Sequence, residues 1–281
     1  MHKEKEKTLT CVVFSSLKHP WLEIVLKGQE QTWINEKLPE GFTVIHAHGS
    51  PVKSIFGFLD DSRARLRWKN RYLDYLIRLF EYPLTFPFLL YVPSWRPSKL
   101  ISVKYDAIHL IFPDFYNGMR WKILGIMKYF IEETNDNYLF LTSSSSYVNP
   151  EILMESLENL RDEEHCVGAL SYSGANFPAG SNRLFTRKLV MRILKNRRLW
   201  DATLVEDLAL GKLLLKIGIE TKFIELISIA NLEELRTIPI SKLLSNYHFR
   251  LKSQEIKGSD ARRNDVAIFH ALHKKIIEVK L

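Results

Sequence analysis

Short runs of β-branched and apolar residues alternate with segments of helical periodicity along most of this chain. Four such runs, at 10–17, 42–48, 107–112 and 138–142, predict strands. Between the last two, residues 119–133 carry apolar side chains at helical spacing. Strands that alternate with helices predict an α/β fold of Rossmann-like type, with a mostly parallel mixed sheet flanked by helices.

The later part of the chain continues this alternation. Residues 149–151 (Asn-Pro-Glu) favour a helix start, because they supply a cap, a proline in the first turn and an acid near the positive end of the helix dipole. A further helix is predicted at 204–217, ended by Gly218. Residues 222–228 predict a strand, and 265–279 predict an amphipathic helix.

The segment at about 51–106 interrupts this pattern. It contains a basic and aromatic helical stretch at 62–72, followed by apolar residues punctuated by prolines. It is either an insertion packed on the domain or an element that binds an acceptor or a membrane surface, since cations beside Trp and Tyr suit an interface. No repeat or linker divides the chain, so a single domain at 1–281 is expected.

Composition restricts the class of protein. No apolar run approaches the roughly 20 residues needed to span a bilayer, the first residues do not resemble a secretory signal, and Cys11 and Cys166 make no disulfide framework. A cytoplasmic protein is expected, with peripheral membrane contact left open. The net charge of +8 indicates an anionic partner. A nucleic acid is the weaker alternative, because no zinc-ligand spacing or RNA-binding signature is present.

Four segments, taken in order, resemble the Fringe and β-1,3-galactosyltransferase-like family of inverting GT-A glycosyltransferases. They are 114–122, with Tyr116 and Lys122 at the family's spacing, 138–149, 177–187 and 205–219. The resemblance covers about two-fifths of the chain. It implies a GT-A fold and transfer of a sugar from a nucleotide-sugar donor.

The second segment departs from the family at its metal-binding carboxylates. Ser143, Ser144 and Ser145 occupy the places of three acidic residues. Serine hydroxyls are poor ligands for a hard cation at a diphosphate, so no tightly bound metal is expected and the serines become candidate donor contacts. The alternative is a flexible polar turn with no chemical role.

Without a metal, positive side chains must stabilise the departing nucleoside diphosphate. The resemblance implies that a late basic segment does so, and Arg250 is the first choice. The other candidate donor-binding residues are His248 and Lys252 in that segment, Ser15, Ser16 and Lys18 after the first strand, and Lys122. The alternatives are an edge strand whose charges face water and, for Lys122, ordinary solvated surface.

An inverting transferase also needs a base that takes the proton of the attacking hydroxyl. The resemblance assigns this role to Asp207, with Glu206 as its neighbour and a possible acceptor contact. First-turn acids also stabilise a helix by themselves, which is the alternative. Gly180, Ser181 and Asn182 are the candidate acceptor-binding residues, in a segment expected to be a loop.

Taken with these residues, the resemblance implies an inverting, metal-independent glycosyltransferase that acts on a carbohydrate or lipid-linked saccharide hydroxyl. No cofactor is expected beyond the nucleotide-sugar co-substrate. The alternative is a catalytically inactive GT-A domain that binds a sugar or a partner.

Overall fold

The computed structural model describes most of the chain. The described residues are 7–50, 91–98, 106–114, 118–158, 160, 163–170, 177–201, 204–253 and 265–280. Most of the expected insertion, including the basic and aromatic stretch at 62–72, lies outside them.

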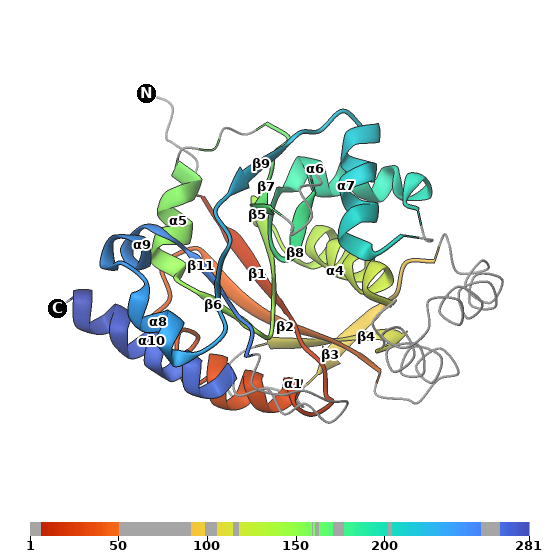
Figure 1. The fold of residues 1–281 in the computed structure, drawn as a ribbon. Helices are drawn as coiled ribbons and strands as arrows, with labels where there is room; N and C mark the ends of the chain where they lie inside the picture. Colours follow the sequence, from red (N-terminus) through yellow and green to blue (C-terminus); the bar gives the residue numbers. More distant parts are fainter. Residues whose placement is uncertain are drawn as a thin grey trace, which may run out of the picture.

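One large sheet forms the centre of the described structure (Figure 1). Its strands are β1 (Leu9–Phe14), β2 (Phe42–Ser50), β3 (Trp95–Ser98), β4 (Asp106–Pro113), β5 (Tyr138–Ser143), β7 (Cys166–Leu170), β8 (Pro178–Thr186) and β9 (Thr221–Ile224). They lie in the order β3-β4-β2-β1-β5-β8-β7-β9. Within this sheet β3 and β8 run antiparallel to the other strands. The sheet is therefore mixed and mostly parallel, as predicted.

A small second sheet packs against one face of the large one. It consists of β10 (Ile227–Ile229), β11 (His248–Leu251) and β6 (Ser146–Val148), with β11 in the middle. Tyr147 and Phe249 of this sheet share a buried apolar cluster with Phe140 of β5. The small sheet thus covers the large sheet where β5 ends.

Helical segments cover both faces of the large sheet (Figure 1). They are α1 (Trp21–Glu23), the π-helix η1 (Ile24–Gln29), α4 (Met119–Glu133), α5 (Pro150–Glu158), α6 (Arg187–Lys195), the 3₁₀ turn η4 (Arg197–Leu199), α7 (Glu206–Lys216), α8 (Leu232–Thr237), α9 (Ile240–Ser245) and α10 (Asp265–Lys280).

Side chains that alternate along β1 pack into two hydrophobic cores, one on each face of the large sheet. Cys11 and Val13 join the cluster that includes α5 and α10, whereas Val12 and Phe14 join the cluster that includes α4, α6 and α7. Successive strand residues point to opposite faces, so a strand buried on both faces is apolar throughout. Within the described residues, no helix is long and apolar enough to cross a membrane.

Most of the predicted elements are confirmed. The four strand runs lie in β1, β2, β4 and β5, the helix predicted at 119–133 is α4, and Gly218 ends α7 with a φ of 75°.

Two predictions were wrong in detail. The strand expected at 222–228 is two strands in different sheets, because the chain leaves the large sheet after Ile224. The segment at 177–187, expected as a loop, is strand β8 followed by the start of α6. Pairing with β5 and β7 on its two sides gives β8 its strand conformation despite its proline and glycine.

Candidate functional site

The strand order places a topological switch point between β1 and β5. The chain runs from β1 to β2 and β4 on one side of β1, and then returns to β5 on the other side. Open α/β sheets bind ligands at the carboxyl ends of the strands at such a point. The backbone N–H of Ser144, just after β5, donates to the carbonyl oxygen of Phe14 at the end of β1 (3.1 Å). The serine run therefore lies at the switch point.

Residues 143–146 form a buried turn between β5 and β6, which we call the serine turn. The Oγ atom of Ser143 lies 3.3 Å from that of Ser145 and 3.0 Å from that of Ser146. The buried amide of Gln29 donates to the carbonyl oxygens of Ser143 (3.0 Å) and Ser146 (2.9 Å). This turn is a hydrogen-bonded structure, so the alternative of a flexible turn is not supported. Gln29, at the end of the π-helix, was missed by the sequence analysis.

The late basic segment lies beside the serine turn. Strand β11 pairs antiparallel with β6, so that Arg250 is opposite Ser146. The backbone N–H of Leu251 also donates to the carbonyl oxygen of Ser145 (2.8 Å). Because β11 is the middle strand of its sheet, the edge-strand alternative for this segment was wrong.

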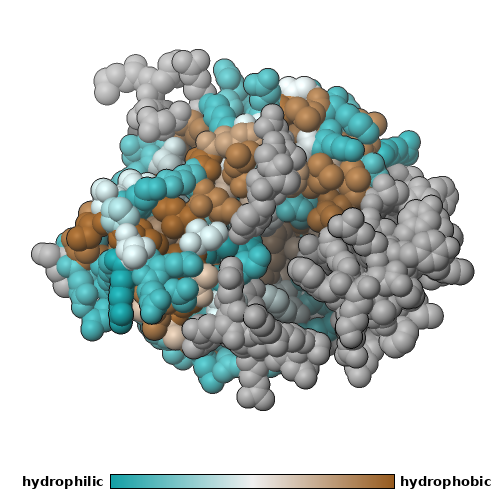
Figure 2. All heavy atoms as spheres, in the orientation of Figure 1, coloured by the Kyte–Doolittle hydropathy of each residue, from teal (hydrophilic) through white to brown (hydrophobic). Residues whose placement is uncertain are grey.

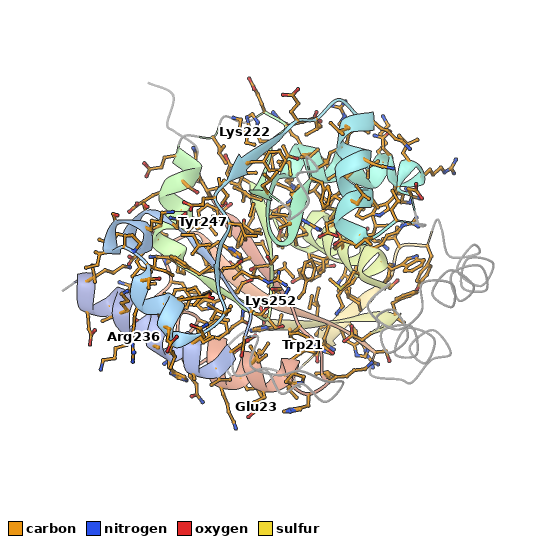
Figure 3. The ribbon with its side chains drawn as sticks, in the orientation of Figure 1. Trp21, Glu23, Lys222, Arg236, Tyr247 and Lys252 are labelled. Carbon is orange, nitrogen blue, oxygen red and sulfur yellow. The ribbon has the colours of Figure 1, made fainter. Side chains whose placement is uncertain are left out.

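The side chains of β11 differ in the charge they can supply. His248 is buried, and burial, followed by the positive charge of Arg250, lowers the pKa of its imidazole to about 3. The expectation that His248 contributes positive charge was therefore wrong, because the ring is neutral near pH 7. Arg250 is half-buried. Lys252 directly follows the end of the strand (Figure 3) and is exposed. These two are the cations of the segment.

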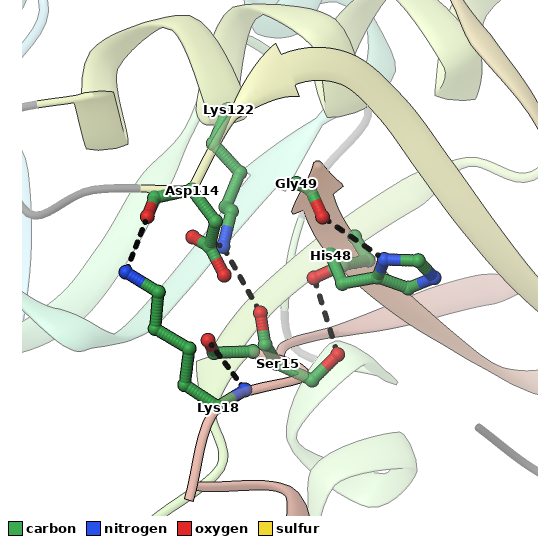
Figure 4. Close-up of polar contacts among 8 residues, drawn as sticks. Ser15, Lys18, His48, Gly49, Asp114 and Lys122 are labelled. Atoms are coloured by element: carbon green, nitrogen blue, oxygen red, sulfur yellow. Dashed lines mark hydrogen bonds and ion pairs between the residues drawn. The ribbon is translucent and has the colours of Figure 1, made fainter. Parts of the chain in front are cut away.

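Lys122 lies at the other side of the switch point (Figure 4). Its ammonium is buried and donates to Asp114 Oδ1 (2.8 Å) and to the carbonyl oxygen of Ser15 (3.0 Å). Burial by itself raises the pKa of the Asp114 carboxyl, but the Lys122 ammonium more than offsets this and the pKa is lowered. The alternative of a solvated surface lysine was therefore wrong. The Lys122 ammonium links the residues that follow β4 to those that follow β1, and in this arrangement it is not available to a ligand.

The residues after β1 surround this ion pair (Figure 4). Ser15 Oγ donates to the carbonyl oxygen of Ala47 (3.2 Å), and Ser16 Oγ accepts from the backbone N–H of Lys18 (3.3 Å). The exposed Lys18 ammonium donates to the carbonyl oxygen of Asp114 (3.2 Å). The structure therefore brings Ser15, Ser16, Lys18 and Lys122 together at the carboxyl ends of β1 and β4.

A buried ion pair organises the predicted acceptor side. The guanidinium of Arg183 on β8 makes two hydrogen bonds to the Glu206 carboxylate at the start of α7, one of them 2.9 Å long. The Arg183 side chain is 0% exposed and that of Glu206 is 14% exposed. Burial lowers the pKa of the guanidinium, but the carboxylate more than offsets this and the pKa is raised. Arg183 was missed by the sequence analysis.

Asp207 lies beside this pair and is partly exposed. A Cβ atom built on Gly180 would lie 3.3 Å from Arg183 Nη2, 3.6 Å from Glu206 Oε2 and 3.9 Å from Asp207 Oδ2. The next residue, Ser181, accepts a hydrogen bond at its carbonyl oxygen from Thr142 Oγ1 on β5 (3.0 Å). Gly180 and the two acids therefore lie close to the end of β5 and the serine turn.

Two of the candidate acceptor-binding residues are not placed to contact a sugar. The side chains of Ser181 and Asn182 are buried, and Asn182 Oδ1 accepts from Tyr247 Oη (3.4 Å). The expectation for Asn182 is not supported, because its side chain is fully buried and bonds to Tyr247, which precedes β11. Gly180 is the partly exposed member of the three.

The described residues contain no group of three or more His, Cys, Asp or Glu side chains that could hold a metal ion. No protein-family model and no curated protein sequence matches this chain. Fold and geometry define the class: an α/β protein with a mostly parallel mixed sheet, whose polar residues gather at the carboxyl ends of the strands.

Proposed function

We propose that this chain is an inverting, metal-independent glycosyltransferase with a GT-A fold. It transfers a sugar from a nucleotide-sugar donor to a hydroxyl group of a carbohydrate or lipid-linked saccharide. The observation that carries the proposal is the pairing of β11 with β6, which brings Arg250 beside the serine turn at the switch point.

Arg250 and Lys252 stabilise the leaving nucleoside diphosphate in this proposal. Negative charge grows on the diphosphate as the glycosidic bond breaks, and cationic side chains at hydrogen-bonding distance lower the energy of that state. An arginine can contact two phosphate oxygens at once, which suits it to replace a metal ion. Hydroxyl groups of the serine turn add neutral hydrogen-bond donors.

Asp207 acts as the base. A carboxylate that accepts the proton of the attacking hydroxyl promotes its addition to the anomeric carbon. Glu206 is held by Arg183, so it positions the start of α7 and leaves Asp207 as the acid beside Gly180. The absence of a side chain at Gly180 allows an acceptor to approach this carboxylate.

A two-part experiment tests the proposal. Nucleoside diphosphates and nucleotide sugars are screened for a rise in Tm, since a ligand that binds the folded chain stabilises it. The stabilising donor is then assayed for hydrolysis and transfer in EDTA, with Asp207→Asn and Arg250→Gln against the control variants Glu233→Gln and Arg236→Gln on α8.

We expect turnover in EDTA that both site variants abolish and neither control changes. Donor binding without turnover by the unmodified chain would indicate the inactive sugar-binding domain instead. Turnover that requires Mn²⁺ would contradict the metal-independent mechanism.

A further inference from the structure

The helical face formed by α6, η4 and α7 carries an unusual distribution of charge. Between His165 and Trp200 the sequence has no Asp or Glu, but it has seven basic residues: Arg183, Arg187, Lys188, Arg192, Lys195, Arg197 and Arg198. A segment with only positive charges attracts anions more strongly than the net charge of the whole chain would suggest.

Several of these cations bond to other groups of the protein. Arg183 pairs with Glu206, and Arg187 donates to carbonyl oxygens at the end of α4, including that of Ile131 (2.8 Å). Arg192 pairs with Glu164 and also donates to the carbonyl oxygen of Ile217, just past α7. The Arg192 contact holds α6 against the end of α7, so the outer sides of both helices belong to one face.

Several of the other cations are exposed together with apolar side chains. Lys195 and Arg198 are exposed beside Met191 (47% exposed) and Leu199 (42%). On α7, Lys212 and Lys216 are exposed on either side of Leu215, which at 59% is the most exposed large apolar residue of the described chain. Residues three and four apart share a side of a helix, and Figure 2 shows hydrophobic and hydrophilic residues side by side over α7.

We propose that this face binds an anionic lipid surface. Exposed apolar side chains surrounded by Lys and Arg suit the boundary between headgroups and acyl chains, where the apolar groups insert and the cations contact phosphates. A nucleic acid would use the cations but gain little from Met191, Leu199 and Leu215. Asp207 lies in the first turn of α7, the helix that also carries Leu215; if the proposed function holds, a bilayer bound to this face would present a lipid-linked acceptor to the same helix.

Co-sedimentation with vesicles tests this proposal without any enzymatic activity. Vesicles of phosphatidylcholine alone are compared with vesicles that also contain phosphatidylglycerol. We expect binding to the second kind only. Lys195→Gln with Arg198→Gln should weaken it about 30-fold, because each basic residue near such a surface contributes about a factor of five. Met191→Ser with Leu215→Ser should also weaken it, most clearly at high salt.

The matched control is Lys37→Gln with Lys274→Gln, which makes the same change of charge at exposed lysines outside this face. It should bind almost as well as the unmodified chain, and circular dichroism should show all variants folded. No binding to either vesicle, or equal weakening by the control, would overturn the proposal. Normal vesicle binding by the Met191→Ser, Leu215→Ser variant, together with competition between an oligonucleotide and the vesicles, would also overturn it and would indicate a nucleic-acid surface.

Discussion

The buried pair between Arg183 and Glu206 makes a quantitative prediction. Arg183→Met would remove the guanidinium and leave the Glu206 carboxylate largely buried, with two hydrogen bonds lost. Removing one partner of a buried ion pair costs about 3–5 kcal/mol, because the remaining charge has neither water nor a counter-ion. We expect a loss of this size in the free energy of unfolding, measured by urea denaturation near neutral pH.

The loss should depend on pH in a definite direction. Burial already raises the pKa of the Glu206 carboxyl, and the Arg183 guanidinium limits that rise. Without the guanidinium the pKa rises further, so the folded variant binds a proton more tightly than the unfolded chain. Its stability therefore increases as the pH falls through the raised pKa. The cost of Arg183→Met should be largest at neutral pH and should shrink in acid.

A double variant separates the interaction energy of the ion pair from the effect of losing either side chain alone. Arg183→Met combined with Glu206→Met replaces both charges by apolar groups, an exchange that is often close to neutral for buried pairs. It should recover most of the stability lost in the single variant, giving a clearly non-additive cycle. A single variant that costs less than about 1 kcal/mol at every pH, or additive single costs, would refute this account of the acceptor side.

Three further predictions follow from the site. Gln29→Ala should cost about 2 kcal/mol and weaken donor binding, because two carbonyl oxygens of the serine turn lose their donor, as urea unfolding and Tm shifts can check. Because the pKa of His248 is lowered in the folded chain, its imidazole binds a proton more readily when the chain is unfolded, and the protein should lose stability as the pH falls below about 6.5. His248→Phe should remove about 2 kcal/mol of that loss at about pH 5. Gly180→Ala should lower kcat/KM for acceptor, because its methyl group would lie beside Asp207 and 3.3 Å from Nη2 of the buried Arg183 guanidinium. An unchanged value would contradict acceptor entry at this point.

The features of the fold that are local in sequence were predictable. The apolar run that became β5 is buried on both faces, so its composition alone identifies a central strand. Gly218 ends α7 because an αL backbone position favours glycine over other residues, which is again a local requirement. The same locality explains the position of Ser15, Ser16 and Lys18, because residues that follow one parallel strand lie near those that follow its neighbours.

The features that depend on distant partners were not predictable. Arg183 lies in strand β8, and no pattern near it indicates that Glu206, 23 residues later, satisfies its charge. Gln29 resembles an ordinary polar helix residue until its amide is seen against the serine turn. His248 looked like a cation by residue type, whereas burial decides its protonation. In each case the information lies in tertiary contacts, which override local preference.

The serine turn shows how these distant contacts combine at one place. Phe14 and Gln29 near the start of the chain, and Leu251 near its end, each bond to the backbone of this turn. A buried turn whose backbone groups lacked these partners would cost several kcal/mol, and the docking of β11 supplies one of them, the N–H of Leu251. The same docking brings Arg250 opposite Ser146. Formation of the serine turn and placement of Arg250 beside it therefore depend on the same strand pairing.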